Sequence, residues 1–172
     1  MRLKRLGTIL PLAAMALVLV AGCGGDDSGG GGGGGDLVFG TAADPVVLDG
    51  ALVSDGESLR AIDQMFEGLV TLKEGSTEVV PGLAESWEAD PAGTAWTFQL
   101  RDGVKFHDGT DFDGADVIHS FQRIQDPATQ NQLAAPLSII KEVKQVDDHT
   151  IAFHLTSNFA DFPLLLTDFR LK

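Results

Sequence analysis

The thirty residues from Thr94 to Arg123 read TAWTFQLRDGVKFHDGTDFDGADVIHSFQR, and this stretch decides the fold of the region around it. Large apolar side chains recur at every second position, in Trp96, Phe98 and Leu100, which is the period of a strand with one buried face. Asp-Gly pairs then end two extended segments, because this dipeptide readily takes turn conformations. The stretch therefore predicts a strand, two turns and a helix in direct succession.

The helix at the end of this stretch is predicted from its cap and from its apolar spacing. Asp113 is well placed as the N-cap, and Asp116 follows three residues later as a variant of the capping box. Val117, Phe121 and Ile124 share one face at helical spacing. We expect this face to be buried against the sheet.

The beginning of the chain has the features of an export signal. Arg2, Lys4 and Arg5 precede the apolar run from Leu6 to Val20, which is shorter than an ordinary membrane span. Small residues then lead into the only cysteine of the sequence, Cys23, as in a bacterial lipobox. We expect residues 1–22 to be removed and Cys23 to be lipidated, which would anchor the protein to a membrane. The alternative is an ordinary signal peptide followed by an incidental cysteine.

The charge balance is strongly acidic, with 12 Lys and Arg against 25 Asp and Glu and a formal net charge of −13. Removal of residues 1–22 would take away three positive charges and no acid, which gives a formal charge of −16. Such a surface would be repelled by nucleic acid and by anionic membrane faces, so neither is predicted as a partner. A single cysteine also allows no internal disulfide, so the domain must rely on its core.

Residues 24–35 consist of Gly, Asp and Ser, with seven consecutive glycines at 29–35. This composition predicts a flexible tether. A glycine-rich phosphate loop is excluded, because no strand precedes the glycines and no Gly-Lys-Ser/Thr follows them. The sequence thus divides into a signal at 1–22, a lipidated cysteine and tether at 23–35, and a folded part at 36–172.

The folded part is expected to begin with a short strand from Leu37 to Gly40. Residues Thr41 to Pro45 follow as the loop at its carboxyl end, which is a usual place for ligand contacts in open α/β sheets. A loop that merely turns the chain is the alternative.

Further elements are predicted from periodicity and turn residues. They are a helix from about Glu57 to Glu67, capped by Asp55 or Ser54 and ended by Gly68; a strand at 69–72; a hairpin pairing 84–88 with 95–100; a hairpin pairing 139–146 with 150–155; and a helix starting at 158–161. Trp87 and Trp96 would lie on neighbouring strands, either as core residues or as a sugar-stacking platform.

The histidines and clustered aspartates invite a metal hypothesis. The histidines show no H-x-x-x-H or H-E-x-x-H pair, so no metal site is predicted; they are His107, His119, His149 and His154. The aspartates fit a calcium loop poorly, since an EF-hand register places Gly109 at the first ligand position and Ser120 at the twelfth. We predict turn and capping roles instead for Asp108, Asp111, Asp113 and Asp116.

Enzyme chemistry is not predicted. The sequence contains no nucleophile elbow and no Ser or Cys paired with a base in a recognisable context. We therefore expect no catalytic residue and no cofactor.

The order of several segments resembles the solute-binding proteins of peptide and nickel ABC importers, family 5. The matching segments are Asp44-Pro45, Leu48-Asp49, 66–70, 81–87, 97–109, 115–117 and the hairpin 143–151. Two departures are Gly50, where Pro is usual, and Asp113-Gly114, where Thr-Ala is common. The resemblance implies a mixed α/β (α+β), periplasmic-binding-protein-like fold of type II, with two lobes in full-length relatives. Members of this family are several hundred residues long, so we expect an amino-terminal piece with part of the first lobe and its additional domain.

This resemblance implies an extracytoplasmic, lipid-anchored receptor that delivers oligopeptides or similar solutes to an ABC permease. We expect it to be a monomer that faces the periplasm or the cell exterior. Thr41 and Ala42 are the candidates for the edge of the solute cleft. The alternatives are a receptor for nickel or another solute, a stand-alone structural or adhesion lipoprotein, and a secreted enzyme.

Overall fold

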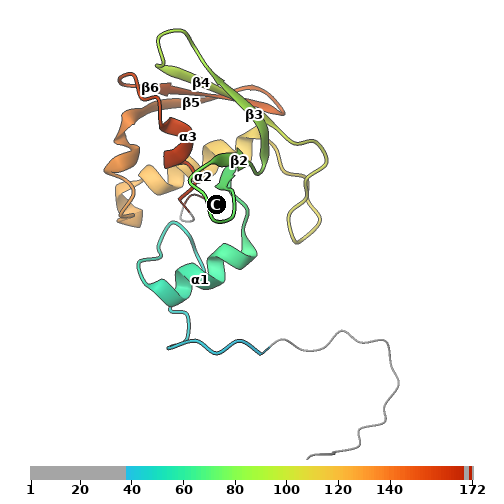
Figure 1. Cartoon of the computed structure of the whole chain (residues 1–172), viewed down its shortest axis with the longest axis vertical. Helices are drawn as coiled ribbons and strands as arrows, with labels where there is room; N and C mark the ends of the chain where they lie inside the picture. Colours follow the sequence, from blue (N-terminus) through green and yellow to red (C-terminus); the bar gives the residue numbers. More distant parts are fainter. Residues whose placement is uncertain (1–37, 169–170, 172) are drawn as a thin grey trace, which may run out of the picture. The chain divides into compact units, whose positions relative to one another are not determined.

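The computed structural model describes residues 38–168 and 171 (Figure 1). The chain divides into two compact units, Met1–Phe39 and Gly40–Lys172, and the fold described below is that of the second. The export signal, Cys23 and the glycine tether lie outside the described residues, so what we expect of them stays a prediction. Among the described residues, no helix has both the length and the apolar character needed to cross a membrane.

A four-stranded antiparallel sheet forms the main layer, in the order β3-β4-β6-β5. Its strands are β3 (Ala84–Ala89), β4 (Ala95–Leu100), β5 (Ile140–Asp147) and β6 (Thr150–Leu155). Both predicted hairpins are confirmed, and they join where Phe98 pairs with Ile151. A separate two-stranded sheet pairs β1 (Val70–Leu72) with β2 (Val79–Pro81).

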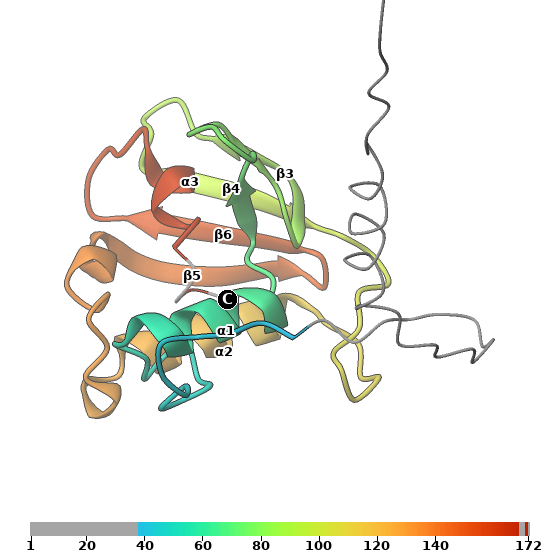
Figure 2. The same ribbon diagram turned by 60° about the horizontal axis from the view of Figure 1, so that its bottom comes forward.

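One face of the large sheet carries the core. Phe98, Ile151 and Phe153 are fully buried, as expected when alternate residues of each strand point to the same face. Helix α2 (Gly114–Gln125) lies along this face in Figure 2, and its Phe121 ring is centred 5.0 Å from that of Phe153. The short helix α3 (Phe162–Leu165) adds Phe162, 5.2 Å from Phe153. Both helices therefore contribute a ring to one aromatic cluster on this face of the sheet.

The two tryptophans belong to this cluster. Trp87 stacks on Phe98, with ring centroids 6.1 Å apart and an interplanar angle of 24°. Trp96 lies 6.1 Å from Phe162. Both indoles are partly buried and pack against the core, which favours the core role over a sugar-stacking platform.

The start of α2 has the predicted capping box. The carboxylate of Asp113 accepts a hydrogen bond from the backbone N–H of Ala115 at 2.7 Å, and Asp116 accepts one from the N–H of Asp113 at 3.0 Å. These bonds satisfy amides that the helix itself cannot pair. The predicted apolar face is buried, and it consists of Val117, Phe121 and Ile124.

The remaining clustered aspartates act locally. Asp108 accepts hydrogen bonds from the backbone N–H and the hydroxyl of Thr110, at 2.9 and 2.7 Å. These bonds close the turn in which Gly109 has a φ of +88°, a conformation that favours glycine. Asp111 forms an ion pair with Lys105. The predicted turn and capping roles are confirmed for Asp108, Asp113 and Asp116, whereas Asp111 lies in a β-bridge with Lys105 and forms an ion pair instead.

The predicted first strand is wrong for the residues that the structure describes. Val38, Phe39 and Gly40 are outside any strand, and the side chains of Val38 and Phe39 are 91% and 68% exposed. A strand needs a neighbouring strand to pair its backbone groups, and none of the described strands pairs with these residues. Leu37 lies outside the described residues.

Helix α1 (Gly56–Met65) is capped by Asp55, which accepts from the backbone N–H of Ser58 at 2.8 Å. It ends earlier than predicted, because Phe66 is already extended, with φ −123° and ψ 151°. Gly68 is thus not the helix stop, and its carbonyl accepts instead from the backbone N–H of Leu83 at 2.9 Å. The chain needs an extended segment here to enter β1.

The segment around Gly68 packs backbone to backbone against Gly82. A Cβ atom at position 82 would lie 2.4 Å from the carbonyl oxygen of Gly68 and 3.0 Å from that of Leu69. Neither oxygen can move without moving the chain, so this position requires glycine. The segment between α2 and β5 contains two 3₁₀ turns, Pro127–Thr129 and Pro136–Ile139.

Candidate functional site

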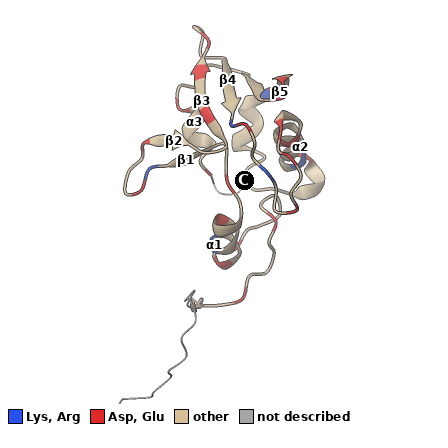
Figure 3. Cartoon of the chain, turned by 90° about the vertical axis from the view of Figure 1, so that its right-hand side faces the viewer, with Lys and Arg blue, Asp and Glu red and all other residues tan. Residues whose placement is uncertain are grey.

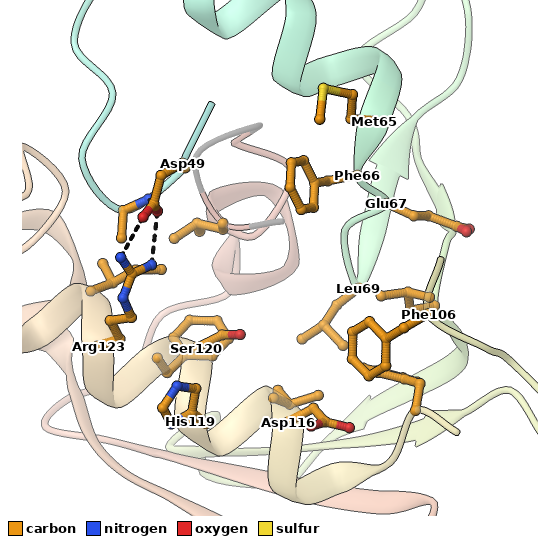
Figure 4. Close-up of a pocket in the computed structure, with 18 of the residues that line it drawn as sticks. Asp49, Met65, Phe66, Glu67, Leu69, Phe106, Asp116, His119, Ser120 and Arg123 are labelled. Carbon is orange, nitrogen blue, oxygen red and sulfur yellow. Dashed lines mark hydrogen bonds and ion pairs between the residues drawn. The ribbon is translucent and has the colours of Figure 1, made fainter. Parts of the chain in front are cut away.

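The described residues form an open groove with a volume of about 790 Å³. It is lined by residues from 48–51, from 64–67 at the end of α1, from 104–107, and from 116–124 on α2 (Figure 4). We call it the α1–α2 groove. These segments are far apart in the sequence, so the groove depends on the tertiary fold.

The groove has an apolar floor and large apolar side chains at its rim, although charged and polar side chains line it as well. Its floor is the edge of the core, with buried side chains that include Leu69, Phe112, Val117, Phe121 and Ile124. Its rim carries large apolar side chains that are 40–48% exposed, namely Leu48, Met65, Phe66 and Phe106. The core of the protein therefore reaches solvent at this groove.

One ion pair joins two walls of the groove. Arg123 in the last turn of α2 donates from both terminal nitrogens to the carboxylate of Asp49, and the Nη1–Oδ1 distance is 2.8 Å. The backbone N–H of Ala51 adds a third hydrogen bond to this carboxylate at 3.0 Å. The Arg123 hydrogen bond lowers the pKa of Asp49, although partial burial opposes the shift. The same bond raises the pKa of Arg123.

The other charged residues of the groove lining are also bonded within the chain. Glu67 pairs with Arg101, and Lys105 pairs with Asp111. Asp116 is part of the capping box of α2. The acidic side chains as a whole are spread over β3, α1, α2 and the loops (Figure 3). The charged side chains of the groove lining thus have partners within the chain.

The histidines are not gathered at one place. His107 and His119 line the groove, whereas His149 lies at a hairpin tip with its Nε2 atom 3.2 Å from the Oδ1 atom of Asp102. His154 lies on β6. Within the described part of the chain, no group of three or more His, Cys, Asp or Glu side chains is arranged to hold a metal ion.

The residues predicted for the solute cleft lie outside the groove. Thr41 and Ala42 are exposed in the segment before α1, and the Thr41 hydroxyl donates to the carbonyl of Ala43 at 2.9 Å. Their role at a cleft edge stays a prediction. The groove was not predicted, because no local signal in the sequence could have joined Asp49 to Arg123, which are 74 positions apart.

The sequence is similar to known proteins of one family. Residues 78–172 match the family described as bacterial extracellular solute-binding proteins, family 5 Middle. The heme-binding protein A of Haemophilus influenzae is 38% identical over 143 residues, covering 73% of this chain and 26% of the relative. The dipeptide-binding protein of Escherichia coli is 35% identical over 144 residues, covering 73% and 27%.

A solved structure shows the same fold. The periplasmic binding protein DppA from Helicobacter pylori, in complex with the peptide STSA, has a TM-score of 0.66 and 36% identity, covering 74% of this chain and 28% of that one. The chain thus spans about a quarter of the length of these relatives. The predicted mixed helix and sheet fold of periplasmic binding proteins is confirmed. Because the family match extends over more than half of its residues, the chain belongs to the bacterial extracellular solute-binding proteins of family 5.

Proposed function

We propose that the chain works as part of an extracytoplasmic, lipid-anchored receptor that delivers oligopeptides or similar solutes to an ABC permease. The observation that carries this proposal is the family membership, together with the peptide bound to the DppA relative. The name of the Haemophilus relative adds heme as a second solute class to be tested.

The anchor and the tether fit this role. Lipidation at Cys23 would hold the receptor at the membrane, since each buried methylene group contributes about 0.8 kcal/mol. The glycine-rich residues 24–35 would let the folded part rotate while keeping it near the permease, which raises its effective concentration there.

The solute would lie between two lobes that close on it by a hinge motion. Thr41 and Ala42 would form one edge of this cleft, and most contacts would come from the part of the relatives that this chain does not cover. We therefore expect the chain alone to bind no solute detectably.

Calorimetry on two proteins tests the receptor function. The first is the chain itself, and the second is the chain joined after Lys172 to the part of the E. coli dipeptide-binding protein that follows the matched region. With a pool of di- to pentapeptides, and separately with hemin, we expect micromolar binding only by the joined protein. A Thr41→Tyr substitution should weaken this binding at least tenfold, whereas Val146→Asp on β5 should not.

Two outcomes would contradict the proposal. Micromolar binding by the chain alone would show that the second lobe is not required. If the joined protein folds but binds neither peptides nor hemin, the proposed receptor function is wrong.

The anchor is tested by metabolic labelling with palmitate. The unaltered chain should incorporate the label and sediment with membranes, and Cys23→Ser should abolish both. Ser28→Ala in the tether is the control and should change neither. Continued incorporation of palmitate in Cys23→Ser would contradict lipidation at this residue.

A further inference from the structure

We propose that the Asp102-Gly103 pair, in the turn after β4, is a site of spontaneous covalent modification at which Asp102 isomerises to isoaspartate. The sequence holds five Asp-Gly pairs, and the structure leaves this one open to the reaction; the five are Asp49-Gly50, Asp55-Gly56, Asp102-Gly103, Asp108-Gly109 and Asp113-Gly114. The inference goes beyond the proposed receptor function and does not depend on it.

The reaction needs an accessible carboxyl group followed by an accessible backbone N–H. The glycine nitrogen attacks Cγ of the aspartate, and the N–H proton and the carboxyl OH leave together as water, so that a succinimide ring forms. Water then opens the ring. Opening at the main-chain carbonyl gives isoaspartate, in which the chain runs through Cβ and Cγ and the total mass is unchanged. Glycine in the second position favours the attack, because it has no side chain to obstruct it.

The carboxylates of the five pairs differ in how they are held. The side chain of Asp102 is 88% exposed, and its only partner among the described residues is His149, whose Nε2 lies 3.2 Å from Oδ1. Each of the other four carboxylates accepts a hydrogen bond from a backbone N–H two or three positions further on, and the donors are Ala51, Ser58, Thr110 and Ala115. These bonds keep the four carboxyl groups turned away from the glycine nitrogen that would attack them.

The pair Asp108-Gly109 is the closest match to Asp102-Gly103 and isolates this difference. Gly103 and Gly109 both lie in exposed turns with positive φ, +69° and +88°, and a Cβ at either position would have no atom within 4 Å. The N–H of Gly109 donates to the carbonyl of Phe106 at 2.9 Å, whereas the N–H of Gly103 donates to no group of the described residues. Only the pair at 102–103 therefore combines the two free groups.

The ionisation of the held carboxylates acts in the same direction. The hydrogen bond from Arg123 lowers the pKa of Asp49, and the bond from the backbone N–H of Ser58 lowers that of Asp55. The hydroxyl of Thr110 lowers the pKa of Asp108. A lower pKa leaves less of the protonated acid, which is the form that can lose its oxygen as water. These three pairs are therefore protected further.

The modification would change the chain inside the fold. Isoaspartate adds one atom to the main chain between Arg101 and Val104. The N–H of Arg101 donates to the carbonyl of Leu83 at 2.9 Å, and the carbonyl of Val104 accepts from the N–H of Phe112 at 3.0 Å. The added atom would thus lengthen the connection between two backbone hydrogen bonds, at the point where β4 leads into the segment before α2.

Peptide mapping of the full chain after prolonged incubation at mildly acidic pH and physiological temperature tests this inference. Cleavage after lysine gives the peptide 74–105, which contains the pair at 102–103 and one other aspartate, Asp90. Asp90 precedes Pro91, which has no N–H for the attack. The peptide 106–141 contains two Asp-Gly pairs, and the peptide ending at Lys73 contains the other two. Electron-transfer fragmentation distinguishes isoaspartate from aspartate by the masses of the fragment ions.

We expect at least tenfold more isoaspartate at position 102 than at any of the other four pairs. Asp102→Glu should abolish the product in the peptide 74–105, because a glutamate would have to close a larger ring. Asp108→Glu is the matched control and should leave the product at position 102 unchanged. In the chain unfolded by urea, the five pairs should react at similar rates, since the protecting hydrogen bonds are then absent.

Two outcomes would overturn the inference. One is a similar amount of isoaspartate at positions 102 and 108 in the folded chain. The other is a folded chain without isoaspartate at position 102 when the urea-unfolded chain forms it there, because the fold would then protect this pair as well. The measurement uses no solute, so neither outcome bears on the proposed receptor function.

Discussion

The sheet layer and the segment around α1 differ in how they are held. In the sheet layer, Phe98, Phe153 and Phe162 are fully buried, and the centroids of their rings lie 5.2–6.3 Å apart. In α1, only Ser58 and Ile62 are buried. The sheet layer therefore has its own core, whereas the α1 segment covers little apolar surface.

Hydrogen bonds compensate in part for the small apolar contact of the α1 segment. The Ser58 hydroxyl accepts from the backbone N–H groups of Val46 and Val47, at 2.8 and 3.1 Å. The buried side chain of Asn131 donates to the carbonyl of Ala51 at 2.7 Å. Together with the Asp49–Arg123 pair, these bonds fix the position of the segment, and we expect it to open at a lower free energy than the sheet.

The largest expected effect is in the sheet core. Phe98→Ala would remove a ring that packs against Trp87, Phe153 and Phe162, and would leave a cavity. We expect a loss of about 3–5 kcal/mol in the free energy of unfolding, measured by urea denaturation. The exposed control Val146→Ala should change it by less than about 0.5 kcal/mol. A loss below about 1 kcal/mol for Phe98→Ala would break the comparison, because the sheet layer would then not depend on this core.

The contact between Gly82 and Gly68 comes next. Gly82→Ala would place a methyl group 2.4 Å from a backbone oxygen, and we expect it to destabilise the protein by about 1–3 kcal/mol. Gly56→Ala is the matched control, because a Cβ at this position in the first turn of α1 has no atom within 4 Å. It should be neutral or stabilise by up to about 1 kcal/mol. Melting temperatures are measured for both variants. A similar drop in melting temperature for Gly82→Ala and Gly56→Ala would contradict this difference.

The two helix caps test separately how the α1 segment and the sheet layer are stabilised. Asp55→Ala and Asp113→Ala should each cost about 1 kcal/mol, because each carboxylate satisfies an amide at a helix start. Amide hydrogen exchange should separate them: Asp55→Ala should speed exchange in α1 alone, and Asp113→Ala in α2 and the sheet. Asn at either position should restore most of the loss. Faster exchange throughout the sheet in Asp55→Ala would show that the two regions unfold together.

The smallest effect is expected for the ion pair between the regions. Both side chains are partly exposed, so Arg123→Ala should cost about 0.2–1 kcal/mol at neutral pH. The folded pKa of Asp49 is lowered from 3.8, so the stabilisation is present above that value and is lost as the pH falls through the lowered pKa. Arg123→Ala should therefore flatten the decline in stability below about pH 4. Lys73→Ala, which breaks a pair within the β1–β2 turn, should leave this decline unchanged.

Local patterns predicted the elements whose residues interact within a short stretch. The period of two in Trp96, Phe98 and Leu100 marked a real strand, and the Asp113 and Asp116 pair marked a real cap. The same reasoning failed at Val38 to Gly40, an apolar run that pairs with none of the described strands. A run of this length specifies a strand only when a partner is present.

The groove could not be predicted, because its walls meet only in the folded chain. Met65 and Phe66, at the end of α1, are large apolar residues, yet they are about 40% exposed. The exposure of these two side chains depends on tertiary contacts and not on the residues next to them in the sequence. The role of Thr41 and Ala42 at a solute cleft stays a prediction, and these two residues carry no local pattern that identifies a ligand.

The strand order β3-β4-β6-β5 also has a consequence for folding. Each hairpin joins strands that are adjacent in sequence, so each closes a short loop at a small entropy cost. Pairing of β4 with β6 instead brings Phe98 beside Ile151, across the whole of α2. We expect the hairpins to form early and the docking of one on the other to limit the folding rate. During synthesis the first hairpin is complete before β5 exists, so it must wait with one edge unpaired until the second hairpin is made.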